Sequence, residues 1–388
     1  MKKKIAILGS TGSIGKNLLK ILEKDKSNVE IILLTANKNY NLLYNQIKKH
    51  NVKNVIITNK LSHKNLVKKL KNRNIKIFND YSSFNLIFKK KIDYVMSSIS
   101  GIDGLIPTIK IIKYTKKIAI ANKEAIICAW NLIKKELTKN KTFFIPVDSE
   151  HFSLWYALQN LPSNKIEKIY LTASGGPFLN FNKQKLKKIN ISQALKHPNW
   201  KMGKKISIDS STLMNKVFEV IEAKHIFELP YSKISILTHP SSYVHALVKF
   251  SNGLIKIIAH DTTMTIPIFN TIFTDEKKKI SSKDIDIKKL NTLDLKQVDI
   301  KHFPAIKIIK KIPKKISLYE SVIVSANDRL VNLFLEKKIK YNQIVSIMLK
   351  LINYKVFLKY KKLTPKKIED IISVKNHVGY KIKKLLKL

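Results

Sequence analysis

The sequence predicts an α/β fold in three parts: a largely parallel sheet, an α+β domain with a flexible lid, and a C-terminal helical bundle. Short apolar segments alternate with amphipathic helical ones through the first 147 residues, which is typical of βαβ units. A glycine-rich turn follows the first apolar segment, and helical periodicity takes over from about residue 306. We therefore expect domains at 1–147, 148–276 and 306–388, with a lysine-rich linker at 277–305.

The length of 388 residues suffices for two or three domains with their own cores. No apolar run approaches the roughly 18–20 residues of a membrane span, and the N-terminal residues do not have the form of a signal peptide. Cys128 is the only cysteine, which excludes an intrachain disulfide and a cysteine-based zinc cluster. These features predict a cytoplasmic protein without a membrane partner.

The formal net charge of +47 raises the alternative of a nucleic-acid-binding protein. However, only Arg73 and Arg329 are arginines, whereas recognition of bases and phosphates relies heavily on arginine. The lysines are spread over nearly every predicted helix, which indicates a compositional bias. We expect no specific nucleic-acid partner, although scattered lysines still give non-specific affinity for phosphates.

The first predicted strand, residues 4–8, ends at the turn Gly9-Ser10-Thr11-Gly12-Ser13-Ile14-Gly15. An amphipathic helix follows to about Lys24, and a second strand covers residues 29–36. Glycines allow the sharp turn, and the N–H groups at the helix start can then face a pyrophosphate. The G-x-x-G-x-x-G spacing is only moderately specific, but its strand–turn–helix context predicts a Rossmann-like dinucleotide-binding domain.

The residues after the second strand favour NADP over NAD. An NAD site has an acidic residue here, which accepts a hydrogen bond from the ribose 2′-hydroxyl. This chain has Asn37, Lys38 and Asn39 instead, and a cation with two amides suits a 2′-phosphate. The alternative is that Lys38 is one more surface lysine.

Further strands are expected near residues 54–58, 76–78, 93–97 and 118–121. The last one ends at Asn122-Lys123-Glu124, where the loops of such a sheet reach a ligand. Lys123 could anchor a substrate or transfer a proton there, although a lysine in such a place is more often only solvated.

The stretch Phe143–His151 is central to the predicted site. An apolar strand delivers Asp148 and Glu150, with Ser149 between them, to its C-terminal end. Acids at the carboxyl end of a strand suggest a catalytic site. The alternative is that Asp148 or Ser149 caps a helix that runs to about Asn160.

A strand at residues 166–173 leads into Ser174-Gly175-Gly176-Pro177, whose backbone N–H groups can hold an anion. The segment from there to His197-Pro198-Asn199-Trp200-Lys201-Met202-Gly203 is bounded by glycines, as lids that exclude water often are. The alternative is that Trp200 packs in a small core.

Residues 209–212, Asp-Ser-Ser-Thr, predict the start of a helix because their side chains can cap one. In that helix Glu219 can face Asp148 and Glu150, and three carboxylates suit Mg²⁺ or Mn²⁺, which prefer oxygen ligands. A hydroxyl, an amide and a cation suited to phosphate come from Ser210, Asn215 and Lys216.

Three strands are then expected at residues 234–237, 243–250 and 254–259, with a tight hairpin turn at Asn252-Gly253. The edges of these strands are suited to contacts between subunits.

Six motifs, in one order along the chain, resemble those of the 1-deoxy-D-xylulose 5-phosphate reductoisomerase family of the non-mevalonate isoprenoid pathway. They are Ile7–Gly15, Ala121–Glu124, Pro146–His151, Leu171–Phe178, His197–Trp200 and Asp209–Glu219. Six motifs in register are highly specific, although none is decisive alone. Ser325-Ala326-Asn327-Asp328 also matches the family pattern.

The resemblance implies a homodimeric enzyme that uses NADPH and a divalent cation (Mg²⁺, Mn²⁺ or Co²⁺). It would rearrange 1-deoxy-D-xylulose 5-phosphate to a branched aldehyde and reduce this to 2-C-methyl-D-erythritol 4-phosphate. The alternatives are an ordinary NADP-dependent sugar-phosphate dehydrogenase and a non-catalytic binding protein.

The resemblance also implies residue roles. NADPH would be bound by Thr11, Gly12, Ser13, Ile14, Asn37, Lys38, Asn39, Asn122, Glu124 and Gly203. The cation would be ligated by Asp148, Glu150 and Glu219, which together with Lys123 would be the catalytic residues. The sugar phosphate would be held by Lys123, Ser149, Glu150, Ser174, His197, Ser210, Asn215, Lys216 and Glu219, under a flap that carries His197 and Trp200.

Three features depart from the family pattern. Asn37 and Val217 stand where a glycine is common, and Ala259–Pro267 differs from the family's glycine-, proline- and arginine-containing sequence. Asparagine tolerates left-handed geometry, so the turn at Asn37 can survive. The altered segment puts the local loop shape and the dimer contact in question, whereas every proposed metal and phosphate residue is present.

Overall fold

The structure, a computed structural model, describes residues 2–71, 74–159, 161, 165–200, 202–274 and 276–387. Arg73, Lys201 and the predicted helix end at Asn160 lie outside the described residues. The chain forms two compact units. Unit 1 comprises Met1–Ala125, Ile133–Asp148 and Met264–Ile280, and unit 2 comprises Ile126–Leu132, Ser149–Thr263 and Ser281–Leu388.

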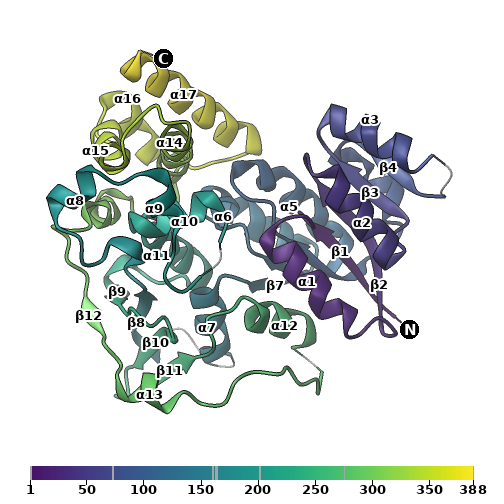
Figure 1. Ribbon diagram of the computed structural model, residues 1–388, viewed down its shortest axis with the longest axis horizontal. Coiled ribbons are helices and arrows are strands. Elements are labelled where there is room, and N and C mark those ends of the chain that lie inside the picture. The colour runs from purple at the N-terminus through teal and green to yellow at the C-terminus, as the bar shows by residue number, and fades with distance from the viewer. Residues whose placement is uncertain are drawn as a thin grey trace. The chain divides into compact units, whose positions relative to one another are not determined.

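Unit 1 is built on a seven-stranded sheet in the order β4-β3-β2-β1-β5-β6-β7, with all neighbouring strands parallel (Figure 1). The strands are β1 (Lys3–Leu8), β2 (Val29–Ala36), β3 (Asn54–Ile57), β4 (Lys76–Phe78), β5 (Ile92–Ser97), β6 (Thr115–Ile120) and β7 (Phe143–Pro146). The strand order reverses beside β1, which is where open sheets of this kind bind ligands at their carboxyl edge. The predicted Rossmann-like sheet is confirmed.

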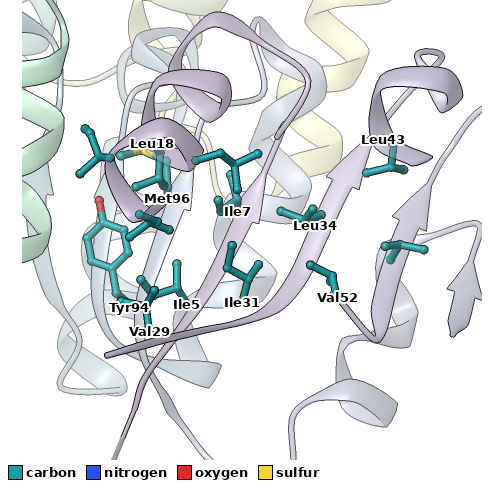
Figure 2. Packing of buried hydrophobic residues seen from close by; sticks show 14 of the residues in the cluster. Ile5, Ile7, Leu18, Val29, Ile31, Leu34, Leu43, Val52, Tyr94 and Met96 are labelled. Atoms are coloured by element: carbon teal, nitrogen blue, oxygen red, sulfur yellow. The ribbon is translucent and has the colours of Figure 1, made fainter. Parts of the chain in front are cut away.

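One core of unit 1 lies between this sheet and helices α1 (Ser13–Glu23), α2 (Tyr40–His50), α3 (Lys60–Lys69) and α12 (Thr265–Phe273). Figure 2 shows Ile5 and Ile7 of β1 in this core, with Leu18 of α1 and Tyr94 of β5. The neighbouring Ala6 and Leu8 are buried as well, because a parallel sheet is covered on both faces; this explains the uninterrupted apolar sequence of β1.

Helix α12 joins this core from a distant part of the sequence. It contributes Ile268, Ile272 and Phe273 to the cluster, and its Thr271 hydroxyl lies 2.7 Å from the Tyr94 hydroxyl. The other helices between the strands are α4 (Phe84–Ile87), α5 (Leu105–Ile111) and α6 (Lys123–Lys139).

Unit 2 contains a mixed five-stranded sheet in the order β11-β10-β8-β9-β12. The strands are β8 (Ile166–Ala173), β9 (Ile234–Thr238), β10 (Val244–Phe250), β11 (Ile255–Ala259) and β12 (Lys296–Gln297). The predicted hairpin is confirmed for β10 and β11, and Gly253 in its turn has a φ of +86°. The first of the three predicted strands, β9, does not adjoin this hairpin, because β8 lies between β9 and β10.

Helices α7 (Ser149–Ala157) and α11 (Met214–Phe227) pack on this sheet through a shared apolar cluster that includes Leu154, Val220 and Leu171. Between β8 and α11 lie the short helices α8 (Lys183–Lys187) and α9 (Ile191–Leu195), followed by α10 (Lys204–Ser211).

The C-terminal part of unit 2 is helical, as predicted. Its helices are α14 (Leu318–Leu335), α15 (Tyr341–Leu351), α16 (Lys355–Leu358) and α17 (Ile368–Leu386). The stretch predicted as a linker contains only α13 (Ile287–Asn291) and β12 before the 3₁₀ segment Pro304–Lys311. No helix among the described residues is long and apolar enough to cross a bilayer. The division into four segments stays a prediction.

Candidate functional site

The glycine turn after β1 has the form that a dinucleotide phosphate site needs. Gly9 has a φ of +85°, and a Cβ on Gly15 would lie 2.6 Å from the Gly9 carbonyl oxygen, so neither position tolerates a side chain. Thr11 and Gly12 lead into α1, which begins with Ser13 and Ile14 and has no side-chain cap among the described residues. The first N–H groups of this helix therefore suit an anion.

Gln46 of α2 holds this turn in place, and no local sequence pattern indicates this role. The Ser10 hydroxyl donates to Gln46 Oε1 at 2.8 Å, and Gln46 Nε2 donates back to the Ser10 carbonyl at 2.9 Å. The Thr35 hydroxyl accepts from Gly9 N at 2.9 Å. Buried polar groups with satisfied hydrogen bonds fix a single loop conformation.

Asn37, Lys38 and Asn39 are exposed at the end of β2, as a site for a 2′-phosphate requires. Asn37 Nδ2 donates to the Thr58 hydroxyl at 2.7 Å, and Asn39 Oδ1 caps α2 by accepting from Leu42 N. Asn37 does not have a positive φ, so its left-handed tolerance is not used.

Asn122, Lys123 and Glu124 begin helix α6. Asn122 caps the helix by accepting from Ala125 N at 3.0 Å, and its Nδ2 donates to the Gly101 carbonyl at 2.9 Å. Lys123 Nζ lies 2.5 Å from Asp148 Oδ2, and both side chains are largely buried. The alternative that Lys123 is only a solvated lysine is therefore wrong.

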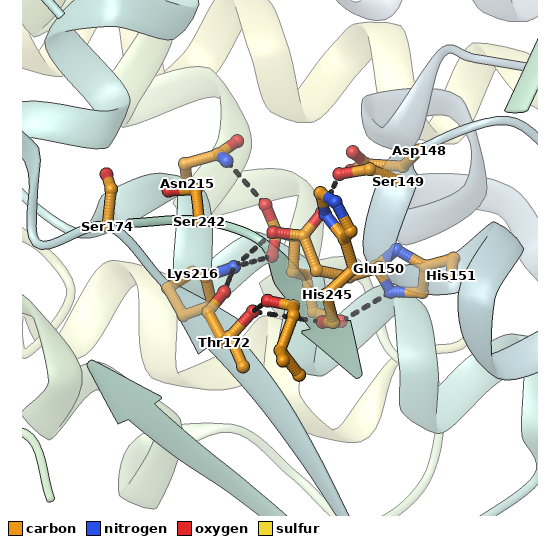
Figure 3. Close-up of polar contacts among 12 residues, drawn as sticks. Asp148, Ser149, Glu150, His151, Thr172, Ser174, Asn215, Lys216, Ser242 and His245 are labelled. Atoms are coloured by element: carbon orange, nitrogen blue, oxygen red, sulfur yellow. Dashed lines mark hydrogen bonds and ion pairs between the residues drawn. The ribbon is translucent and has the colours of Figure 1, made fainter. Parts of the chain in front are cut away.

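In unit 2, Glu150 on α7 and Glu219 on α11 offer carboxylate oxygens within 4.8 Å of each other. Lys216 binds both: its Nζ lies 2.7 Å from Glu150 Oε1, and it also donates to Glu219 and to the Thr172 carbonyl (Figure 3). Asn215 Nδ2 donates to the second oxygen of Glu219 at 2.5 Å. The structure thus brings together four of the predicted site residues, Glu150, Asn215, Lys216 and Glu219.

The charges in this cluster stabilise one another. Burial favours the neutral form of Glu150, but the Lys216 ammonium and the hydrogen bonds from Lys216 and Ser149 outweigh it and hold the pKa of Glu150 well below its usual range. Burial likewise favours a neutral Lys216, but the two carboxylates raise its pKa above the usual value. Two carboxylates and one ammonium leave a net negative charge in a buried place, which favours a cation.

Asp148 ends the second of the three segments of unit 1, and one peptide bond joins it to Ser149, the first residue of α7. Only Ser149 separates Asp148 from Glu150, so the connectivity of the chain keeps these two carboxylates near each other.

Ser174 follows β8 and is held by His197. The backbone N–H groups of Asn199 and Trp200 both donate to His197 Nδ1, at 3.1 and 3.0 Å, so the imidazole proton is on Nε2. Nε2 lies 3.0 Å from the Ser174 hydroxyl oxygen, which also accepts from Gly176 N. Because its oxygen already accepts two hydrogen bonds, the Ser174 hydroxyl directs its own proton elsewhere, as a donor to an anion would.

Burial lowers the pKa of His197 to about 4, so the ring is neutral at pH 7 and this tautomer persists.

The glycine turn after Ser174 packs against the end of α10. Gly175 and Gly176 have φ values of +79° and +66°, and a Cβ on Gly176 would lie 3.0 Å from the Ser210 carbonyl oxygen. Ser210 is therefore next to the turn that carries Ser174.

The predicted helix start at residues 209–212 is wrong, because these residues end α10. The Ser211 and Thr212 hydroxyls donate back to the Ile208 carbonyl, and Leu213 turns the chain with a φ of +57° before α11 begins at Met214. The Ser325–Asp328 motif of α14 binds the last turn of α10 through a hydrogen bond. Asn327 Nδ2 donates to Asp209 Oδ1 at 2.7 Å.

The segment His197–Trp200 lies against the loop before β10. Asn199 Nδ2 donates to the Pro240 carbonyl at 2.6 Å and to the Ser242 hydroxyl at 3.0 Å. Trp200 is half-buried and meets the His245 ring edge-on, so it does not lie in a small core of its own. Gly203 precedes α10 within unit 2, and a Cβ there would meet no described atom within 4 Å.

Comparisons with known proteins point to one family. One family model for 1-deoxy-D-xylulose 5-phosphate reductoisomerase matches residues 5–130, and two models for its C-terminal domain match residues 144–227 and 261–379. The chain is 57% identical over 382 residues to the 1-deoxy-D-xylulose 5-phosphate reductoisomerase of Pelagibacter ubique, with 98% of each chain covered. It is 38% identical over 346 residues to that of Sulfurihydrogenibium sp., with 89% of each covered.

Solved structures agree with these sequence matches. The chain superimposes on the Zymomonas mobilis reductoisomerase in complex with NADPH with a TM-score of 0.88 at 29% identity, covering 100% of this chain and 99% of that one. A DOX-P reductoisomerase in complex with NADPH, fosmidomycin and magnesium gives a TM-score of 0.91 at 27% identity, covering 100% and 98%.

Proposed function

The chain belongs to the 1-deoxy-D-xylulose 5-phosphate reductoisomerase family, and we propose an assignment of the family's reaction to its residues. The enzyme converts 1-deoxy-D-xylulose 5-phosphate to 2-C-methyl-D-erythritol 4-phosphate in isoprenoid precursor biosynthesis, with NADPH and a divalent cation. Family membership sets aside the ordinary dehydrogenase and the non-catalytic binding protein.

The observation that carries the residue assignment is the pair of the buried Glu219 and the partly buried Glu150, with Lys216 bound to both. Their donors are all carboxylate oxygens and their shared charge is negative, so the residues fit Mg²⁺, Mn²⁺ or Co²⁺. We assign Glu150, Glu219 and the adjacent Asp148 as the ligands. When bound, the cation supplies Lewis-acid activation and a template for the ketone and a neighbouring hydroxyl of the substrate.

The substrate's phosphate is assigned to the donors around the Ser174 turn. Ser174 has its proton directed away from His197 and Gly176, which suits a phosphate oxygen, and Ser210 lies beside the same turn. Asn215 and Lys216 supply the amide and the cation. Anchoring the phosphate, remote from the reacting carbons, orients those carbons for the rearrangement.

Lys123 and Ser149 are assigned to the reacting end of the substrate. The ion pair between Lys123 and Asp148 fixes the ammonium in a buried place, where it can donate to a substrate oxygen and stabilise developing negative charge. Ser149 donates to Glu150 and so orients that carboxylate. The segment His197–Trp200 is assigned as the flap that keeps water away from the intermediates.

NADPH is assigned to unit 1, as the glycine turn and its anion-binding helix start support. Residues Thr11–Ile14 hold the pyrophosphate, while Asn37, Lys38 and Asn39 hold the 2′-phosphate. Asn122, Glu124 and, from unit 2, Gly203 make further contacts with the cofactor.

We also propose that the enzyme is a cytoplasmic homodimer, with the edge strand β11 in the dimer contact. Leu254, Ile255 and Ile257 are 65%, 58% and 48% exposed on and beside this strand, which an isolated subunit would leave open to aggregation. Light scattering on the purified protein tests this: a dimer that becomes a monomer in Ile257→Lys supports it, and a wild-type monomer contradicts it.

The function is tested with 1-deoxy-D-xylulose 5-phosphate and NADPH, with and without EDTA. We expect NADPH oxidation that yields the branched polyol phosphate and stops on chelation. Turnover that survives chelation contradicts the metal assignment. A protein that oxidises no NADPH with this substrate and Mg²⁺ contradicts the whole proposal.

A further inference from the structure

His260 lies in Ala259–Pro267, the segment that departs from the family pattern, and it stacks on His245. The ring centroids are 3.7 Å apart and the planes differ by 15°. His245 is in β10 and His260 directly follows β11, whose Ala259 pairs with Val244. The stack therefore closes the open end of the β10–β11 hairpin.

Backbone carbonyls fix the tautomers of both rings. His245 Nε2 lies 3.1 Å from the His260 carbonyl oxygen, and His260 Nδ1 lies 2.7 Å from the Asp261 carbonyl oxygen. Each of these nitrogens must carry the proton, since a carbonyl can only accept. Burial lowers the pKa of His245 to about 3 and also lowers that of His260, so two neutral rings face each other without repulsion.

Trp200 meets the other member of this stack. Its ring lies 6.1 Å from that of His245, centroid to centroid, at an interplanar angle of 71°, which is the edge-to-face arrangement that aromatic pairs prefer. Ser242 connects the same two segments: its hydroxyl accepts from Asn199, and its carbonyl accepts from the Thr262 hydroxyl at 3.3 Å. The segment 260–262 thus supports the surface on which His197–Trp200 rests.

We propose that His260 is a positioning residue for the flap. By stacking on His245, it holds the His245 ring in the orientation against which Trp200 packs edge-to-face. His260 acts through His245 and needs no contact with substrate or cofactor. The inference rests on the proposed function, in which His197–Trp200 covers the sugar phosphate.

Kinetics of His260→Ala test the inference. Without the His260 ring, the packing of Trp200 against His245 should weaken and the flap should close less readily. KM for 1-deoxy-D-xylulose 5-phosphate should therefore rise about two- to ten-fold. Substrate still draws the flap closed at saturation, so kcat should change much less. His260→Phe keeps a flat ring on His245 and should restore KM to near the wild-type value.

His377→Ala is the matched control, because His377 also contacts aromatic rings, those of Phe357 and Tyr360, but in the C-terminal helices. Its KM should equal that of the wild type. In a Trp130→Phe, Trp155→Phe background, Trp200 is the only tryptophan. Its emission should shift to longer wavelength in His260→Ala, since a loosened indole is more hydrated.

The effects of His260→Ala and Trp200→Leu on KM should be non-additive in a double-mutant cycle, because both substitutions disrupt the packing of Trp200 against His245. An unchanged KM in His260→Ala, or additive effects in the cycle, overturns the inference. If the alanine variant does not fold, a KM of His260→Phe about ten-fold above wild type overturns it and a wild-type value supports it. Wild-type enzyme that does not turn over the substrate would instead contradict the proposed function.

Discussion

Replacing Lys216 with methionine tests the charge balance of the site. Lys216 is 3% exposed, and its Nζ binds Glu150 at 2.7 Å as well as Glu219. Methionine preserves most of the volume but leaves two carboxylates facing each other away from water. Removing one partner of a buried ion pair costs about 3–5 kcal/mol. We expect the metal-free variant to unfold in urea at a midpoint about 1–2 M lower, for a denaturant slope of about 3 kcal/mol/M.

Magnesium should recover part of this loss. In the variant, the Lys216 ammonium no longer lies against Glu150 and Glu219, so a cation that binds these carboxylates only in the folded state stabilises it. At a hundred-fold excess over Kd, this stabilisation is roughly 2.7 kcal/mol. The measurement is the urea midpoint of wild type and variant, with EDTA and with saturating Mg²⁺, followed by tryptophan fluorescence.

Lys249→Met is the control, because Lys249 pairs at 2.6 Å with Glu167 on the surface of unit 2. Exposed ion pairs contribute little, so its midpoint should not move measurably. The charge-balance reasoning is refuted if metal-free Lys216→Met unfolds at the wild-type midpoint, or if Mg²⁺ stabilises the wild type and the variant does not respond.

Three further predictions concern single side chains. Glu219→Gln should lower turnover by more than about 100-fold, because a cation ligand is lost, while the Kd for NADPH, measured by fluorescence titration, stays within about two-fold of wild type; near-normal turnover would remove Glu219 from the site. Ser174→Ala should raise KM about 10- to 100-fold, since a hydrogen bond to a charged phosphate is lost; an unchanged KM would place the phosphate elsewhere. Burial raises the pKa of Glu320 to about 7. The folded protein then holds this proton up to about pH 7, whereas unfolded glutamate loses it near pH 4.5, so stability should fall by roughly 3 kcal/mol as pH rises through that window. Glu320→Gln should flatten this slope of the urea midpoint against pH, and a slope that persists in the variant would assign it to another group.

The strands were the most predictable part of the fold. β2 and β8 begin and end at the predicted residues, because a strand covered on both faces reads as an apolar run bounded by turn residues. The end of α10 was not predictable in the same way. Serine, threonine and aspartate at 209–212 can cap a following helix or bond back to a preceding one, and only the tertiary structure decides between the two.

The site was predictable in its residue types more than in its contacts. The sequence predicts that Glu150 and Glu219 lie close together, and their carboxylate oxygens do lie within 4.8 Å of each other. Lys216 was expected as a phosphate ligand, but its ion pairs with both carboxylates depend on the packing of α7 on α11, which local sequence does not encode. The stack of His245 on His260 likewise requires the register of a hairpin, and Gln46 requires the approach of α2 to the glycine turn.

The path of the chain has a consequence for its synthesis on the ribosome. All seven strands of unit 1 have been made by residue 146, yet Ile268, Ile272 and Phe273, which complete its core, belong to α12. At a synthesis rate of about 5–20 residues per second, roughly ten seconds pass between the completion of β7 and that of α12, and part of one apolar face of the sheet is uncovered during this time. During that interval the nascent chain depends on chaperones or on transient contacts with neighbouring segments to cover this face. A chain truncated before residue 264 would lack α12, and the apolar face would stay exposed permanently.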